Sequence, residues 1–109
     1  MAQFDVHLNT GPSKDTIPFV LTIQSSIFDG YGRRLVAPLV RKDRLPKAAF
    51  DSDKRTFPEF QIGQIELVLN PLEIVSIAND RLGAKVMSLA ESGQTISDAV
   101  DEVLARSWS

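Results

Sequence analysis

The sequence of 109 residues contains no cysteine and a single histidine. Without cysteine the chain has no disulfide framework, no thiolate nucleophile and no cysteine-ligated zinc. No apolar run approaches the ~20 residues that cross a bilayer, and the N-terminus lacks the basic patch and apolar stretch of a secretory signal. We therefore expect a redox-independent protein of the cytoplasm with no membrane partner.

Catalytic motifs are equally scarce. The one histidine, His7, lies on the polar phase of a predicted strand with no serine motif to pair with, so we interpret it as a surface residue. Residues 11–14 lack the spacing of a phosphate-binding loop, and residues 30–32 lack the third glycine of a dinucleotide fingerprint. The acids of residues 98–102 fit the start of a solvated helix. The sequence thus predicts no catalytic residue, no cofactor and no metal site.

Length and composition indicate one globular domain covering residues 1–109, since 43% of residues are hydrophobic and 24% are charged. The net charge of -2 hides an uneven distribution. Residues 33–55 carry eight basic and three acidic side chains, whereas residues 56–109 carry three basic and eight acidic ones. Phe50 is the only aromatic residue in the basic stretch, so we interpret it as a solvated loop rather than a stacking surface for nucleic acid.

Hydrophobic alternation predicts strands in the first two thirds of the chain. Two antiparallel hairpins are expected, one from residues 4–8 with 19–24 and one from residues 60–62 with 65–69 around Gly63-Gln64. Residues 35–40 form another apolar run, and its Pro38 lacks the amide donor of a ladder. This strand is therefore expected at an edge or a bulge. Residues 74–77 form one more short apolar run.

In the final third of the sequence the hydrophobic residues recur with a helical period instead of a strand period. Leu82, Val86 and Leu89 share a helical face, which predicts a short helix from residue 79 that Gly93 could end. Thr95 and Asp98 resemble a capping box at the start of a terminal helix. The apolar stripe of that helix consists of Ile96, Val100, Val103 and Leu104. Strands first and helix last indicate an α+β or mainly β small barrel with a helix laid on it.

Two features fit a purely structural account less well. Ile27 and Phe28 are adjacent apolar residues in a break of the strand pattern, so at least one is expected at the surface. Trp108 stands one residue from the end of the sequence, where it is either an anchor for the helix or an interface residue.

These residues fall within a wider resemblance. Residues 19–25, Ile27-Phe28-Asp29, residues 32–36 and Pro38-Leu39 resemble the signature segment of the CcdB family of toxins. Weaker landmarks follow in the same order, among them Phe57-Pro58, Ile62-Gly63 and Leu82-Gly83. The resemblance implies a small antiparallel barrel of the Src-homology-3 type with a C-terminal helix, assembled as a homodimer.

The resemblance also implies a function. Members bind the breakage-reunion subunit of DNA gyrase and trap it on cleaved DNA, a CcdA-like antitoxin releases gyrase, and such pairs serve plasmid maintenance. The toxin performs no covalent chemistry and meets DNA only through gyrase or the antitoxin complex. The implied target-binding positions in this sequence are Ile27, Phe28, Asp101, Trp108 and Ser109.

The sequence departs from the family pattern at its end. It finishes Trp108-Ser109 where the family typically has Trp-Gly-Ile, and Asp101 replaces an asparagine. The segment from Ile96 to Trp108 is also about three residues longer, which is close to one helical turn. The missing isoleucine makes a diverged relative, one that binds an antitoxin but no longer poisons gyrase, an open alternative.

A second alternative is an enzyme. MazF-like endoribonucleases share the barrel, and such a function would place Arg33, Arg34 and the basic loop on RNA phosphates.

Overall fold

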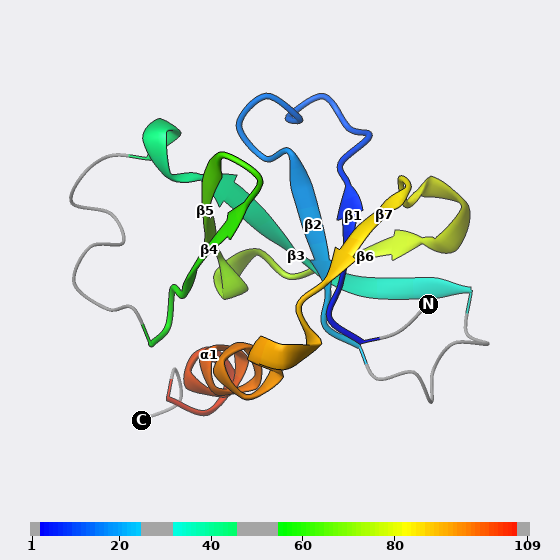
Figure 1. Ribbon diagram of the computed structural model, residues 1–109. Coiled ribbons are helices and arrows are strands. Elements are labelled where there is room, and N and C mark those ends of the chain that lie inside the picture. Colours follow the sequence, from blue (N-terminus) through cyan, green and yellow to red (C-terminus); the bar gives the residue numbers. More distant parts are fainter. Residues whose placement is uncertain (1–2, 25–31, 46–54, 107–109) are drawn as a thin grey trace.

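The computed structural model describes residues 3–24, 32–45 and 55–106. In this part of the chain, seven short strands precede one α-helix at the C-terminal end (Figure 1). The strands are β1 (Asp5–Leu8), β2 (Phe19–Thr22), β3 (Arg33–Arg41), β4 (Glu59–Ile62), β5 (Ile65–Leu69), β6 (Val75–Ala78) and β7 (Lys85–Ser88). The helix is α1 (Gly93–Arg106), and short 3-10 turns are η2 (Lys42–Arg44), η3 (Pro71–Glu73), η4 (Asn79–Arg81) and η5 (Ala90–Ser92).

The strands form one antiparallel sheet in the order β4-β5-β3-β2-β1-β7, and β6 pairs with the first half of β3. The sheet curls around the core, and α1 lies across one end of it (Figure 1). The predicted fold, a small antiparallel barrel of the Src-homology-3 type with a C-terminal helix, is confirmed. Among the described residues, no helix combines the length and the apolar character needed to span a membrane.

Both predicted hairpins are present. In the first, β1 and β2 pair with Val6 opposite Leu21. In the second, Ile62 of β4 lies opposite Ile65 of β5, so Gly63-Gln64 is a two-residue turn. Gly63 takes φ 61°, the left-handed conformation that such turns require and that glycine adopts without steric cost.

The expectation for the strand that contains Pro38 is wrong, because β3 is central. It pairs with β2 on one side and with β6 and then β5 on the other. In an antiparallel ladder the nitrogen and carbonyl of one residue face the same side. The Pro38 carbonyl accepts from the Asn70 amide at 3.1 Å, so its nitrogen also faces the side where β6 pairing ends at Val36 and β5 pairing begins at Leu39. The proline lies where β3 changes partners, and the Asn70 carbonyl, which an amide at residue 38 would face, instead accepts from the Glu73 amide at 3.3 Å.

The helix predicted from residue 79 is also wrong. Residues 79–81 form a 3-10 turn, and β7 follows as an outer strand beside β1. The backbone of β1 and of the residue before it supplies partners at both ends of the pair: the Leu8 amide donates to Ala84 O at 2.9 Å, and Phe4 O accepts from the Leu89 amide at 2.9 Å. Val86 of the supposed buried stripe is 42% exposed. Three apolar residues at helical spacing are a weak helix signal, and the unpaired edge of β1 offers this segment backbone hydrogen bonds as a strand.

The terminal helix is present but begins earlier than predicted. Gly93 starts α1 instead of ending a preceding helix, so Thr95 lies inside the helix and the capping box is wrong. Ile96 and Ala99 are fully buried against the sheet, whereas Leu104 is 58% exposed. The helix thus rests on the core by its first half.

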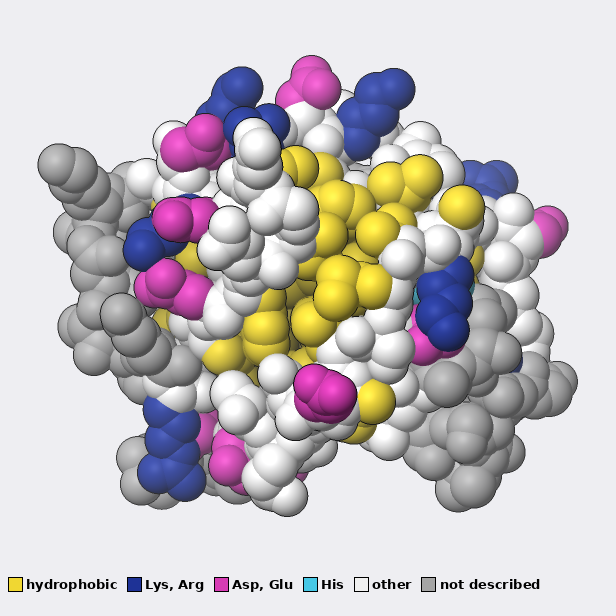
Figure 2. Space-filling view, in the orientation of Figure 1, with side chains coloured by type: hydrophobic (Ala, Val, Ile, Leu, Met, Phe, Trp, Pro, Cys, Tyr) yellow, Lys and Arg dark blue, Asp and Glu magenta, His cyan; other side chains and the backbone are white. Residues whose placement is uncertain are grey.

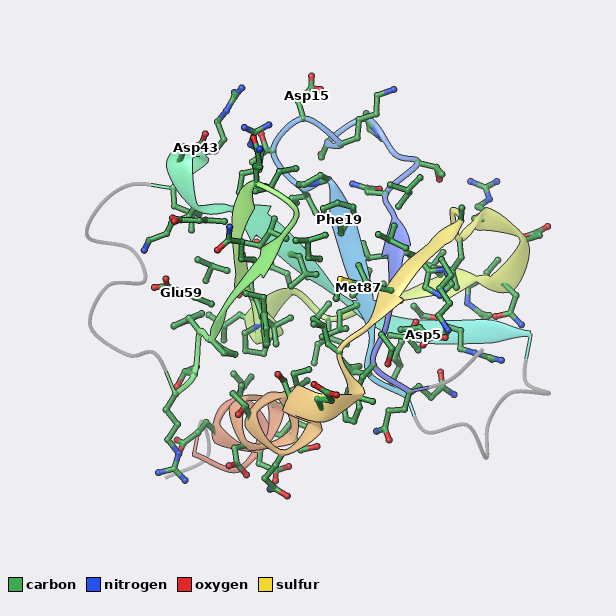
Figure 3. The ribbon with its side chains drawn as sticks, viewed as in Figure 1. Asp5, Asp15, Phe19, Asp43, Glu59 and Met87 are labelled. Carbon is green, nitrogen blue, oxygen red and sulfur yellow. The ribbon has the colours of Figure 1, made fainter. Side chains whose placement is uncertain are left out.

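The core fills the concave side of the sheet and includes Val6, Phe19, Leu21, Leu39, Leu67, Leu69 and Ile96. Phe19 and Met87 lie inside the curve of the sheet (Figure 3). Part of the opposite face, around His7, is covered as well, which the sequence did not indicate. His7 is 3% exposed, and its Nδ1 lies 2.9 Å from the Gly83 carbonyl. The interpretation of His7 as a surface residue is therefore wrong, because the segment leading into β7 folds over it.

Candidate functional site

A cavity of about 200 Å³ lies where the N-terminal segment, the end of β2 and α1 meet. Its described lining is Gln3, Phe4, Ile23, Ile96, Ser97, Val100 and Asp101. Ile96 is fully buried, the other apolar lining residues are half-buried as are Gln3 and Ser97, and Asp101 is exposed. Such a mixture of apolar wall and a few polar groups is typical of a binding site.

Local chain geometry explains how the cavity is built. Ile96, Ser97, Val100 and Asp101 are spaced so that they share one face of α1. On the other side, the side-chain amide of Gln3 donates to the Ile23 carbonyl at 3.1 Å and ties the N-terminal segment to the end of β2. The helix and the two segments therefore present three walls to one space.

Asp101 is the one predicted site residue within the described part of the chain. It is exposed, lines the cavity and makes no hydrogen bond or ion pair with another described residue. Ile27, Phe28, Trp108 and Ser109 lie outside the described residues. Their role stays a prediction.

Sequence reasoning missed the other residues of the cavity. Gln3 and Phe4 come just before β1, and Ile23 directly follows β2, so strand alternation assigns them only to the sheet. No motif links them to a helix that begins at residue 93. Only the packing of α1 on this end of the sheet brings them together.

The acidic side of α1 is partly neutralised. Glu102 Oε1 lies 3.1 Å from Arg55 Nε, and Asp98 Oδ1 accepts from the side-chain amide of Gln94 at 2.9 Å. Of these three acids, Asp101 is the one whose carboxylate has no such neighbour among the described residues, so it can contact a partner. A carboxylate beside apolar groups suits a donor or a cation on that partner.

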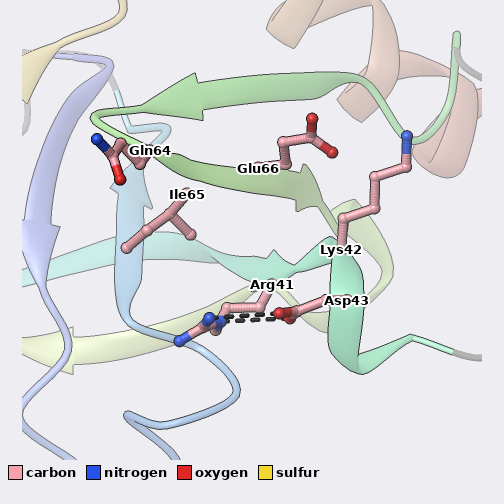
Figure 4. Close-up of a pocket in the computed structure, with 6 residues that line it drawn as sticks. All are labelled: Arg41, Lys42, Asp43, Gln64, Ile65 and Glu66. Carbon is pink, nitrogen blue, oxygen red and sulfur yellow. Dashed lines mark hydrogen bonds and ion pairs between the residues drawn. The ribbon is translucent and has the colours of Figure 1, made fainter.

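A second cavity, of about 360 Å³, lies between β3, η2 and the β4-β5 turn (Figure 4). Its lining is Arg41, Lys42, Asp43, Gln64, Ile65 and Glu66. Lys42 Nζ pairs with Glu59 at 2.9 Å, and Arg41 Nε pairs with Asp43 at 3.3 Å. The cations at this cavity are thus balanced by neighbouring acids, which makes it a poor surface for phosphates.

The arginines that an endoribonuclease would place on RNA are also engaged. Arg34 is 3% exposed, and Arg33 donates to the Ser76 hydroxyl at 2.7 Å and to the Ser76 carbonyl at 2.9 Å. Within the described ranges, no cluster of three histidine, aspartate or glutamate side chains is arranged to hold a metal ion.

Hydrophobic side chains gather on one side of the molecule, over the opening of the curled sheet between the β4-β5 hairpin and β7 (Figure 2). Half-buried residues of these three strands, Phe60, Ile65 and Met87, pack against the core. An apolar surface of this kind is typical of a protein interface.

Comparison with known families decides the identity. The model of the family described as CcdB protein matches residues 3–105. The chain belongs to the CcdB family. It is therefore related to the toxins of toxin-antitoxin systems, and the resemblance carried by residues 19–39 is confirmed. The match includes Asp101 and ends before Trp108 and Ser109.

No curated protein matches this CcdB-family chain in sequence. Among solved structures, an endoribonuclease in complex with its cognate antitoxin, from a mycobacterial species, is similar with a TM-score of 0.69 and 13% identity. The similarity covers 95% of this chain and 94% of that chain. At this identity it shows a shared fold.

Proposed function

We propose that this CcdB-family toxin binds the breakage-reunion subunit of DNA gyrase and poisons it, acting by binding and without covalent chemistry. The observation that supports the proposal most is the placement of Asp101. It occupies a position at which the family contacts its target, and it is exposed at a cavity with no partner among the described residues. Ile27, Phe28, Trp108 and Ser109 complete the proposed contact set.

We further propose that a CcdA-like antitoxin neutralises the toxin and that the toxin acts as a homodimer in the cytoplasm. The similar endoribonuclease is held in a complex with its own antitoxin. The apolar surface between the β4-β5 hairpin and β7 offers this chain an area for such protein partners (Figure 2).

The endoribonuclease alternative receives less support. Arg34 is buried, Arg33 is bound to β6, and the cations of the second cavity are paired with acids. RNA binding depends on cations that are free to replace the counterions of phosphates. A gyrase-directed toxin needs no such surface.

A DNA cleavage assay tests the proposal. Purified protein is incubated with gyrase and supercoiled plasmid, and a parallel tube holds RNA. We expect linear DNA to accumulate with the native chain and to disappear with Trp108→Ala, because a buried aromatic anchor carries much of an interface's energy. Asp101→Ala is expected to reduce cleavage, and Asp98→Ala, on the same helix but outside the cavity, serves as its control.

The other outcomes are equally informative. Persistent cleavage with a folded Trp108→Ala variant would remove Trp108 from the site. Cleaved RNA without linear DNA would favour the endoribonuclease. Antitoxin binding with neither product would identify a diverged relative that no longer poisons.

A further inference from the structure

Phe4 has an unusual backbone. Among the described residues it is the one non-glycine residue with a positive φ, at 71°. The left-handed region is unfavourable for a residue with a Cβ atom, so surrounding contacts must hold it there. The Phe4 amide donates to Thr22 O at 2.6 Å, and the Phe4 carbonyl accepts from the Leu89 amide at 2.9 Å. The residue is fastened to β2 on one side and to the segment before α1 on the other.

The ring of Phe4 lies against the first residue of α1. A Cβ atom added at Gly93 would stand 2.7 Å from Cε2 and 3.2 Å from Cδ2 of Phe4. Gly93 itself has an ordinary helical φ of -55°, so its backbone does not require glycine. What glycine provides at residue 93 is room for the ring.

We infer that Phe4 is a positioning residue that sets the place of α1, and so of Asp101, relative to Gln3 and Ile23 across the cavity. Its strained backbone aims the ring at Gly93, and the ring fixes how closely the helix approaches the sheet. The hydrogen bonds of Phe4 to Thr22 and Leu89 also connect the end of β2 with the segment just before α1. The role of this contact in target binding rests on the proposed function.

Gly93→Ala tests the contact from the side of the helix. Alanine favours a helix more than glycine does, yet its Cβ would press on the Phe4 ring and displace α1. We expect the Kd for the gyrase breakage-reunion subunit to rise by about tenfold or more, as for the loss of an interface hot spot. The matched control is Gly83→Ala, whose Cβ would overlap the Leu8 carbonyl oxygen at the opposite end of β1. The control is expected to cost stability in urea unfolding and to leave the Kd within about twofold.

A double variant shows whether the two residues act through each other. Phe4→Leu removes the ring edge that meets residue 93, so Phe4→Leu with Gly93→Ala is expected to bind more tightly than Gly93→Ala alone. If the two changes combine as independent effects, or if Gly83→Ala weakens binding as much as Gly93→Ala at equal loss of stability, the inference is overturned.

A measurement without gyrase separates this inference from the proposed function. Residual dipolar couplings of backbone amides report the orientation of α1 relative to the sheet. We expect Gly93→Ala to change that orientation, Gly83→Ala to leave it unchanged, and Phe4→Leu with Gly93→Ala to restore it. An unchanged helix in Gly93→Ala refutes the positioning role, whereas a native chain that fails to bind gyrase refutes only the proposed function.

Discussion

Ile96 is the larger of the two fully buried side chains that attach α1 to the core, and its truncation measures how much the helix depends on that contact. Ile96 is fully buried. Ile96→Ala deletes three carbon atoms, worth about 2.4 kcal/mol at ~0.8 kcal/mol each. The space left behind collapses only in part, which raises the expected loss in free energy of unfolding to about 3–4 kcal/mol.

Urea unfolding followed by circular dichroism gives the measurement. With a slope of ~1–3 kcal/mol per molar urea for a protein of this size, the midpoint should fall by roughly 1–4 M. Leu104→Ala is the control, because Leu104 lies on the same helix and is 58% exposed, so its loss should stay within about 0.5 kcal/mol. A loss below ~1 kcal/mol for Ile96→Ala would refute the anchoring of α1 by this residue.

Three further substitutions test the sheet, each by its free energy of unfolding. Gly63→Ala should cost about 1–2 kcal/mol, because φ is 61° while nothing lies within 4 Å of the new Cβ; no loss would contradict a left-handed turn. Lys85→Ala should cost less than ~1 kcal/mol, since its pair with buried Asp5, at 3.4 Å, leaves the lysine side chain 54% exposed; a larger loss, or one insensitive to 1 M salt, would show that the pair acts as a buried one. Pro38→Ala should change stability by less than ~1 kcal/mol, because the Asn70 carbonyl opposite residue 38 already accepts from the Glu73 amide; a gain well above that would mean that the proline strains β3.

Strand alternation and turn residues were sufficient to predict the two hairpins and the α+β class. They could not show which strands pair across long separations in the sequence. Pro38 is compatible with a central strand only because β3 changes partners at that residue, and no local pattern announces such a change. The helix prediction for residues 79–89 was wrong for a related reason, because β7 is a strand through its pairing with β1, which lies far away in the sequence.

The candidate site was predictable to a smaller extent. Asp101 came from the resemblance; it is exposed at the cavity, and its contact role stays a prediction. Gln3 and Ile23 could not be found from the sequence, because nothing in their spacing refers to α1. The burial of His7 was hidden in the same way: a polar residue on the outer phase of a strand is assumed to meet water unless the covering segment is known.

The pairing of β1 with β7 has a consequence for folding during synthesis. Asp5 lies opposite Ser88. The outer edge of β1, the first strand to be synthesised, therefore gains its backbone hydrogen bonds only after β7 has been made. β3 likewise gains β6 only after residue 78 has left the ribosome. Sheets built from contacts so distant in sequence fold slowly, on a scale of about milliseconds to seconds. The helix α1 docks on a sheet that is complete only after β7 has been made, so the cavity lined by Asp101 forms late in synthesis.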